Sequence, residues 1–200
     1  MVSPPARNRF DAARLINIAN GLTAARVLLV PYFAYLLISE REKAALLVFV
    51  VCGATDALDG LLARWLRQRT LVGALLDPIA DKLLMATAFI VLSYVHIAPL
   101  RLTIMVISRD VIILVGSFLY LLLFDASDLR PTGLSKANTV IQILTVIYFL
   151  SVAAFPAESK ALGAGMGSIP NRAVALVCAF TTVASGLQYL YIGLRKLSDA

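Results

Sequence analysis

Four aspartates lie in a stretch of the chain that is otherwise strongly apolar. Asp56 and Asp59 are three residues apart and Asp77 and Asp81 are four apart, so each pair shares one face of a helix. A short basic turn at 67–70 separates the pairs, and an antiparallel helix pair would bring all four carboxylates together. Carboxylates packed this closely cannot all stay ionised without a counter-charge. A divalent metal ion would supply it.

The donor set favours a hard metal ion that acts on phosphate. All ligands would be oxygen atoms, which selects Mg²⁺ or Mn²⁺ over zinc. Four carboxylates can hold two metal ions, and such a pair suits displacement at phosphorus. Arg64 offers a planar fork for phosphate oxygens, and Gly60 and Gly73 allow close approach. The alternative is a set of satisfied polar residues and helix-start aspartates, but burying four carboxylates without a role is costly.

Residues 56 to 81 read DALDGLLARWLRQRTLVGALLDPIAD. This segment resembles the signature of the CDP-alcohol phosphotransferase family, D-x2-D-G-x2-A-R-x8-G-x3-D-x3-D, at all eight fixed positions. The resemblance covers nearly the whole chain and implies a single membrane domain over 1–200, with 1–17 as a juxtamembrane segment. It also implies transfer of a phosphatidyl group from CDP-diacylglycerol to an alcohol, with release of CMP.

The resemblance implies a role for each matching residue. The four aspartates would be the metal ligands, and Asp81 would also be the general base. Capping of a helix start is an alternative role for two of the implied nucleotide-binding residues, Asn20 and Thr23. The full CDP site implied by the resemblance comprises Asn20, Thr23, Gly60, Ala63, Arg64, Thr70 and Gly73.

Residues after position 100 are expected to bind the acceptor alcohol. Arg109 and Lys136 are cations suited to an anionic acceptor, and Asn138 stands where phosphatidylglycerophosphate synthases are expected to have a second lysine. A phosphodiester has one charge less than a phosphate monoester, so Asn138 favours phosphatidylglycerol as acceptor and cardiolipin as product. Glycerol 3-phosphate is the alternative acceptor. An internal ion pair with Asp110 and an interfacial lysine are the structural alternatives for Arg109 and Lys136.

The composition places these residues in a membrane. Of 200 residues, 60% are apolar and 15% are charged, whereas a soluble domain has about 25% charged residues. Mean hydropathy is +0.86. Runs of about 20 apolar residues predict an all-α, polytopic protein with six transmembrane helices, preceded by a short interfacial helix before residue 17. The six predicted spans are 18–38, 44–64, 74–95, 102–124, 138–156 and 173–194.

Loop charges predict the orientation. With six spans, ten Lys and Arg residues lie on the side of both termini and five on the other, so the termini and the aspartates are expected to be cytoplasmic. In a bacterium this is the inner membrane. The net charge of +6 then reflects topology and contact with anionic lipid, and no nucleic acid partner is expected. The resemblance also allows a homodimer formed through the third and fourth spans.

Charged residues within membrane helices are also compatible with two other functional classes. A cation- or proton-coupled transporter also uses buried carboxylates, but it usually binds at the midplane between repeated halves, and no second half matches this cluster. A catalytically inactive scaffold is the other class, and the complete set of eight signature residues argues against it.

Overall fold

The computed structural model describes residues 18–66, 71–123, 132–165 and 167–198, with side chains described over 27–55, 82–117, 132–165, 167–193 and at 195. Throughout these ranges every regular element is an α-helix. Six are long and one is short: α1 (Ile18–Ile38), α2 (Glu42–Leu66), α3 (Leu71–Tyr94), α4 (Leu100–Leu123), α5 (Gly133–Ala154), α6 (Pro156–Ala161) and α7 (Ile169–Ser198). The predicted all-α fold is confirmed for the described part of the chain.

Each long helix overlaps one predicted span, whereas α6 was not predicted. Pro156 in the first turn of α6 provides a fixed φ and lacks the N–H that a helix start leaves unpaired. A second, short helix can therefore begin directly after α5 ends. The predicted interfacial helix before residue 17 lies outside the described residues.

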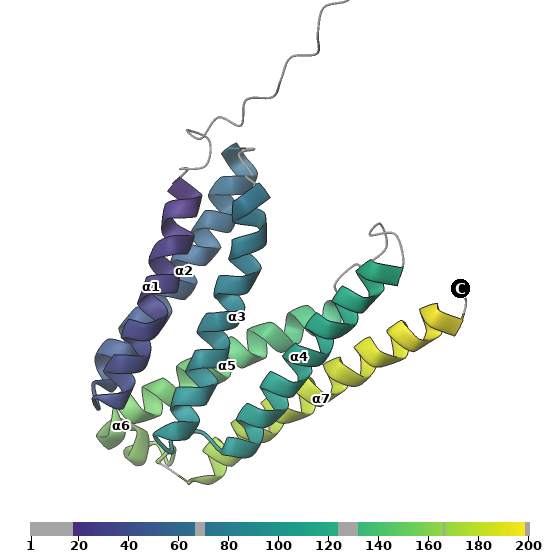
Figure 1. Ribbon diagram of the computed structural model, residues 1–200. Helices are drawn as coiled ribbons and strands as arrows, with labels where there is room; N and C mark the ends of the chain where they lie inside the picture. Colours follow the sequence, from purple (N-terminus) through teal and green to yellow (C-terminus); the bar gives the residue numbers. More distant parts are fainter. Residues whose placement is uncertain (1–17, 67–70, 124–131, 166, 199–200) are drawn as a thin grey trace, which may run out of the picture.

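The helices form two groups joined by α5. α1 packs against both α2 and α3, and α4 packs along α7, while α5 contacts α2, α3 and α7. Figure 1 shows the start of α1, the end of α2 and the start of α3 at one end of the bundle. The starts of α4 and α7 lie at the other end, close to α6.

Aromatic and aliphatic side chains fill the space between the helices. Phe33 of α1 and Phe49 of α2 pack with ring centroids 5.8 Å apart, and both are fully or almost fully buried. Phe89 of α3 and Phe149 of α5 extend the same core. Because these residues come from four helices, the core fixes how α2 and α3, with their aspartates, stand relative to α5.

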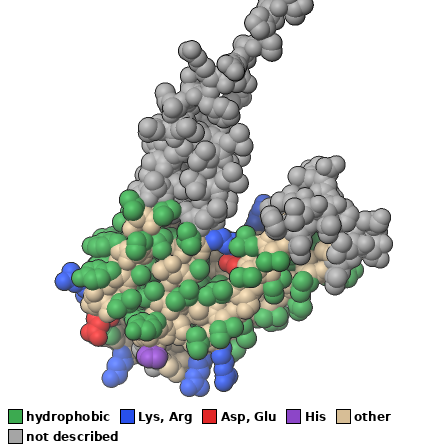
Figure 2. Space-filling model, in the orientation of Figure 1, with side chains coloured by type: hydrophobic (Ala, Val, Ile, Leu, Met, Phe, Trp, Pro, Cys, Tyr) green, Lys and Arg blue, Asp and Glu red, His purple; other side chains and the backbone are tan. Residues whose placement is uncertain are grey.

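The outer surface is apolar as well. Leu28, Phe180 and Leu187 are 74%, 74% and 61% exposed, and hydrophobic side chains cover much of the visible face, with Lys and Arg along its lower edge (Figure 2). Within the described residues, two helical segments are long and apolar enough to cross a membrane, Gly133–Ala154 and Ile169–Gly193. Soluble monomers rarely expose such large apolar patches. These features indicate a membrane protein.

Candidate active site

The four aspartates occupy matching depths in α2 and α3. Asp56 lies ten residues before the end of α2 and Asp81 lies ten residues after the start of α3, or about 15 Å from the turn that joins them. Asp59 and Asp77 lie seven and six residues from the same helix ends, or about 10 Å. The backbone therefore has the helical spacing that the sequence predicted for both pairs. The side chains at these positions are outside the described part.

The implied nucleotide-binding residues fall at the same end of the bundle. Asn20 and Thr23 lie in the first two turns of α1, which packs against both aspartate-bearing helices. Thr70 lies outside the described residues. The other implied contacts lie on α2 and α3, again with side chains that are not described: Gly60, Ala63, Arg64 and Gly73.

Arg109 is the centre of a buried polar cluster between α4, α5 and α7. Only 5% of the residue is exposed. Its Nη2 donates to the hydroxyls of Ser135 and Ser185 at 2.7 Å each, and its Nη1 donates to the Asp110 carboxylate at 2.8 Å. The internal ion pair considered from the sequence is therefore present.

Asp110 also connects this cluster to α3. Its Oδ1 lies 2.7 Å from the Nζ of Lys82. Lys82 directly follows Asp81 in the chain, so the ion pair sets the backbone of Asp81 at the level of the arginine cluster. The structure thereby brings one predicted acceptor residue, Arg109, close to the helix that bears half of the aspartate signature.

The other two predicted acceptor residues lie in the first two turns of α5. Thr132 caps the helix by accepting from the Ser135 backbone N–H at 3.2 Å. Lys136 is exposed, whereas Asn138 is fully buried and its Oδ1 accepts from the Thr182 hydroxyl at 3.1 Å. Asn138 thus lies in the interface between α5 and α7, both of which Arg109 of α4 also contacts, whereas Lys136 is exposed outside it.

Two buried hydrogen-bond donors in this region have no partner within the described part of the protein. They are the Nε of Arg109 and the Nδ2 of Asn138. Leaving a buried donor unpaired costs about 1–3 kcal/mol. Both groups can only donate, so the oxygen atoms of an anion would satisfy them.

The sequence interpretation missed Lys82 and Ser185 as members of this cluster. Lys82 had a usable signal, because a lysine inside an apolar run needs a counter-ion and Asp110 is one of few candidates. Ser185 had none, since a serine in an apolar helix forms hydrogen bonds within its own helix just as readily.

The described side chains include no group of three or more His, Cys, Asp or Glu residues that could bind a metal ion. The predicted metal ligands are all at positions whose side chains are not described. Their donor chemistry, four carboxylates on two helices at matching depths, fits a hard divalent cation.

Comparison with known proteins gives a family match over most of the chain. The family model described as CDP-alcohol phosphatidyltransferase matches residues 16–185. Human cardiolipin synthase (CMP-forming) is 35% identical over 196 residues, which is 90% of this chain and 62% of the human protein. The chain therefore spans less than two thirds of that relative.

Two bacterial proteins that carry a different name also match the chain. The CDP-diacylglycerol–glycerol-3-phosphate 3-phosphatidyltransferase of Bacillus subtilis is 31% identical, over 88% of this chain and 94% of that protein. The Pseudomonas fluorescens protein of the same name is 38% identical, over 68% of this chain and 73% of that protein.

Proposed function

The chain belongs to the CDP-alcohol phosphatidyltransferase family, and we propose that it transfers the phosphatidyl group of CDP-diacylglycerol to phosphatidylglycerol, which forms cardiolipin and releases CMP. One observation supports this proposal above the others. By helix register the four signature aspartates fall at matching depths along α2 and α3, and the buried Arg109, whose Nε has no partner in the described part of the protein, is joined to α3 through Asp110 and Lys82.

Each step of the proposed reaction is assigned to particular residues of the chain. Asp81 accepts the proton of the acceptor hydroxyl. The hydroxyl oxygen then bonds to the phosphorus that bears diacylglycerol, the bond from that phosphorus to the bridging oxygen breaks, and CMP leaves. Arg64 would hold phosphate oxygens of the donor. The nucleotide would lie among the other implied CDP-binding residues: Asn20, Thr23, Gly60, Ala63, Thr70 and Gly73.

The four aspartates would hold one or two divalent cations. Mg²⁺ or Mn²⁺ bound by Asp56, Asp59, Asp77 and Asp81 supplies positive charge beside the pyrophosphate and the departing CMP. Two ligands from each helix would also hold α2 and α3 together at the level of the reacting phosphorus.

Burial and charge support the choice of acceptor. Arg109 already has one counter-ion in Asp110, so a singly charged phosphodiester needs less compensation than a doubly charged monoester. The Nδ2 of Asn138 provides a neutral donor where a lysine would add charge. Lys136, exposed two residues before Asn138, would attract the anion. The alternative acceptor, glycerol 3-phosphate, is favoured by the names of the two bacterial relatives.

The membrane arrangement belongs to the same proposal. All six long helices would span the bilayer as a single domain, with the aspartates near the cytoplasmic surface. The outward apolar side chains and the excess of basic residues on the proposed cytoplasmic side support this arrangement. The acyl chains of both substrates could then stay in lipid while the nucleotide faces water.

An acceptor panel tests the proposal. Purified protein in detergent receives CDP-diacylglycerol and either phosphatidylglycerol or glycerol 3-phosphate, and the lipid product is identified by mass spectrometry. We expect cardiolipin from the wild type, and a shift toward glycerol 3-phosphate in Asn138→Lys, because a second cation favours the extra charge. Thr139→Lys, one residue along on the exposed side of α5, is the matched control. Phosphatidylglycerophosphate as the only wild-type product would overturn the choice of acceptor and leave the enzyme class standing.

A further inference from the structure

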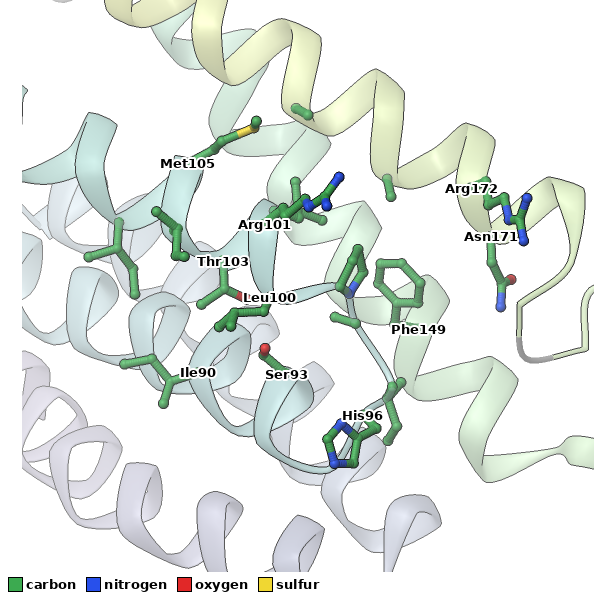
Figure 3. A pocket seen from close by; sticks show the side chains of 18 of the residues that line it. Ile90, Ser93, His96, Leu100, Arg101, Thr103, Met105, Phe149, Asn171 and Arg172 are labelled. Carbon is green, nitrogen blue, oxygen red and sulfur yellow. The ribbon is translucent and has the colours of Figure 1, made fainter.

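A wide groove opens at the end of the bundle opposite the aspartates. It has a volume of about 1510 Å³ and is lined mostly by apolar side chains from the end of α3, the first half of α4 and the start of α7. Figure 3 shows the lining residues Ile90 and Ser93 on α3, Leu100 and Met105 on α4, and Phe149 on α5.

The rim of the groove, at the starts of α4 and α7, lies far from the candidate active site. Its α3 wall runs from Ile90 to Tyr94, nine to 13 residues after Asp81 and therefore about 14–20 Å farther along the helix. Its α4 wall ends at Ser108, one residue before Arg109.

The rim of the groove is cationic. Arg101 in the first turn of α4 and Arg172 in the first turn of α7 both line it and are both exposed (Figure 3). Neither guanidinium forms an ion pair with a side chain in the described ranges. The groove lining includes no carboxylate. An anionic group is therefore the complement of this rim.

The length of the groove along α4 fits within one leaflet. Along α4 the lining runs from Leu100 to Ser108, eight residues farther along the helix or about 12 Å. Half of a hydrocarbon core about 30 Å thick is about 15 Å. A molecule with an anionic head at the arginines and apolar chains directed toward Ser108 would fit, whereas a transmembrane helix would extend past the groove.

We propose that this groove binds an anionic phospholipid of the leaflet opposite the active site, with its phosphate at the cationic rim that Arg101 and Arg172 form and its acyl chains along α4 and α7. The inference rests on the membrane arrangement proposed above and not on the reaction. Such a lipid would fill the apolar space between the starts of α4 and α7 and hold these helices together at the membrane surface.

Native mass spectrometry in detergent tests this site. The protein is titrated with dioleoylphosphatidylserine, an anionic lipid that is not a proposed substrate, and separately with zwitterionic dioleoylphosphatidylcholine. The wild type should retain phosphatidylserine in preference. The double variant Arg101→Gln/Arg172→Gln should bind it roughly tenfold or more weakly, because one lost charge-assisted contact already has about that effect. Ala175→Phe, which places a ring in the groove wall, should weaken binding of both lipids.

A charge-matched control keeps the test specific. Arg41→Gln/Lys160→Gln removes two exposed cations from the same end of the bundle and should leave lipid retention unchanged. Equal retention by both double variants would overturn the proposal. So would a wild-type dimer that Arg101→Gln/Arg172→Gln converts to monomer with no change in bound lipid, since a second copy would then cover the groove. CMP release should persist in every variant, which separates failure of this site from failure of the proposed function.

Discussion

Asp110 is the counter-ion of two cations that come from different helices. It pairs with Arg109 on its own helix α4 and with Lys82 on α3. Arg109 is almost completely buried, whereas the side chain of Lys82 is 37% exposed. Loss of Asp110 would leave a buried guanidinium without a charge partner, but loss of Lys82 would not. The two ends of this ion-pair chain should therefore differ in their importance for stability.

Asp110→Ala should destabilise the protein far more than Lys82→Met. Removal of one partner from a buried ion pair costs about 3–5 kcal/mol, and a partly exposed pair contributes about 1 kcal/mol or less. Thermal unfolding in detergent, followed by circular dichroism, should show a clearly lower midpoint for Asp110→Ala. Glu158→Ala, an exposed carboxylate on α6, should leave the midpoint unchanged. An equal or larger loss in Lys82→Met would contradict this account of the cluster.

At the scale of the elements, a polar face of α5 runs along α7. Ser135, Asn138, Gln142 and Thr145 repeat at three- and four-residue intervals, which is the spacing of one helix face. Hydrogen bonds across the interface begin at the Arg109 cluster and continue through Asn138 and Thr182. In an apolar solvent, such bonds help to hold helices together. The sequence could predict the polar face of α5, but not that α7 would be its partner.

The far end of this interface provides a test. The hydroxyl of Tyr148 on α5 donates to Oδ1 of Asn171 on α7 at 2.7 Å, and the Asn171 amide donates to the Gly165 carbonyl at 3.2 Å. Tyr148→Phe should lower the free energy of unfolding by about 0.5–1.5 kcal/mol. Tyr35→Phe, at a tyrosine that is 59% exposed, should not change it. Equal unfolding midpoints for the two variants in detergent would show that this bond does not stabilise the interface.

At the scale of the whole molecule, hydropathy predicted the positions of the helices well and their packing poorly. Each of the six apolar runs overlaps a long helix because about 20 apolar residues satisfy their backbone groups within one segment. Long-range partners such as Lys82 and Asp110 were not predicted, since nothing in local spacing encodes which helices meet. The sequence also did not predict the groove between α4 and α7, because its walls consist of ordinary apolar residues.

In the candidate site, too, local features could be predicted from the sequence and contacts between distant helices could not. The aspartate signature is local, confined to 26 residues, and its spacing was sufficient to predict the two helices, whereas the metal chemistry that it also indicates stays a prediction. The environment of Arg109 depends on three helices that are distant in sequence, so the sequence could offer only alternatives for it. The family match over residues 16–185 supports the enzyme class that the aspartate signature indicates, whereas the identity of the acceptor remains a proposal.

Release of CMP from CDP-diacylglycerol by the purified protein tests the central claim most directly. With phosphatidylglycerol and Mg²⁺ present, the wild type should release CMP, and release should stop with EDTA and return with added Mg²⁺. Asp81→Asn should reduce the rate by at least the roughly 10²–10⁴-fold expected for loss of a general base, while the protein still elutes as a folded species in detergent. Glu158→Gln, at an exposed carboxylate on α6 outside the signature and outside the Arg109 cluster, is the control and should retain wild-type activity. The account would be contradicted if the wild type released no CMP, or if Asp81→Asn kept more than about a tenth of the wild-type rate.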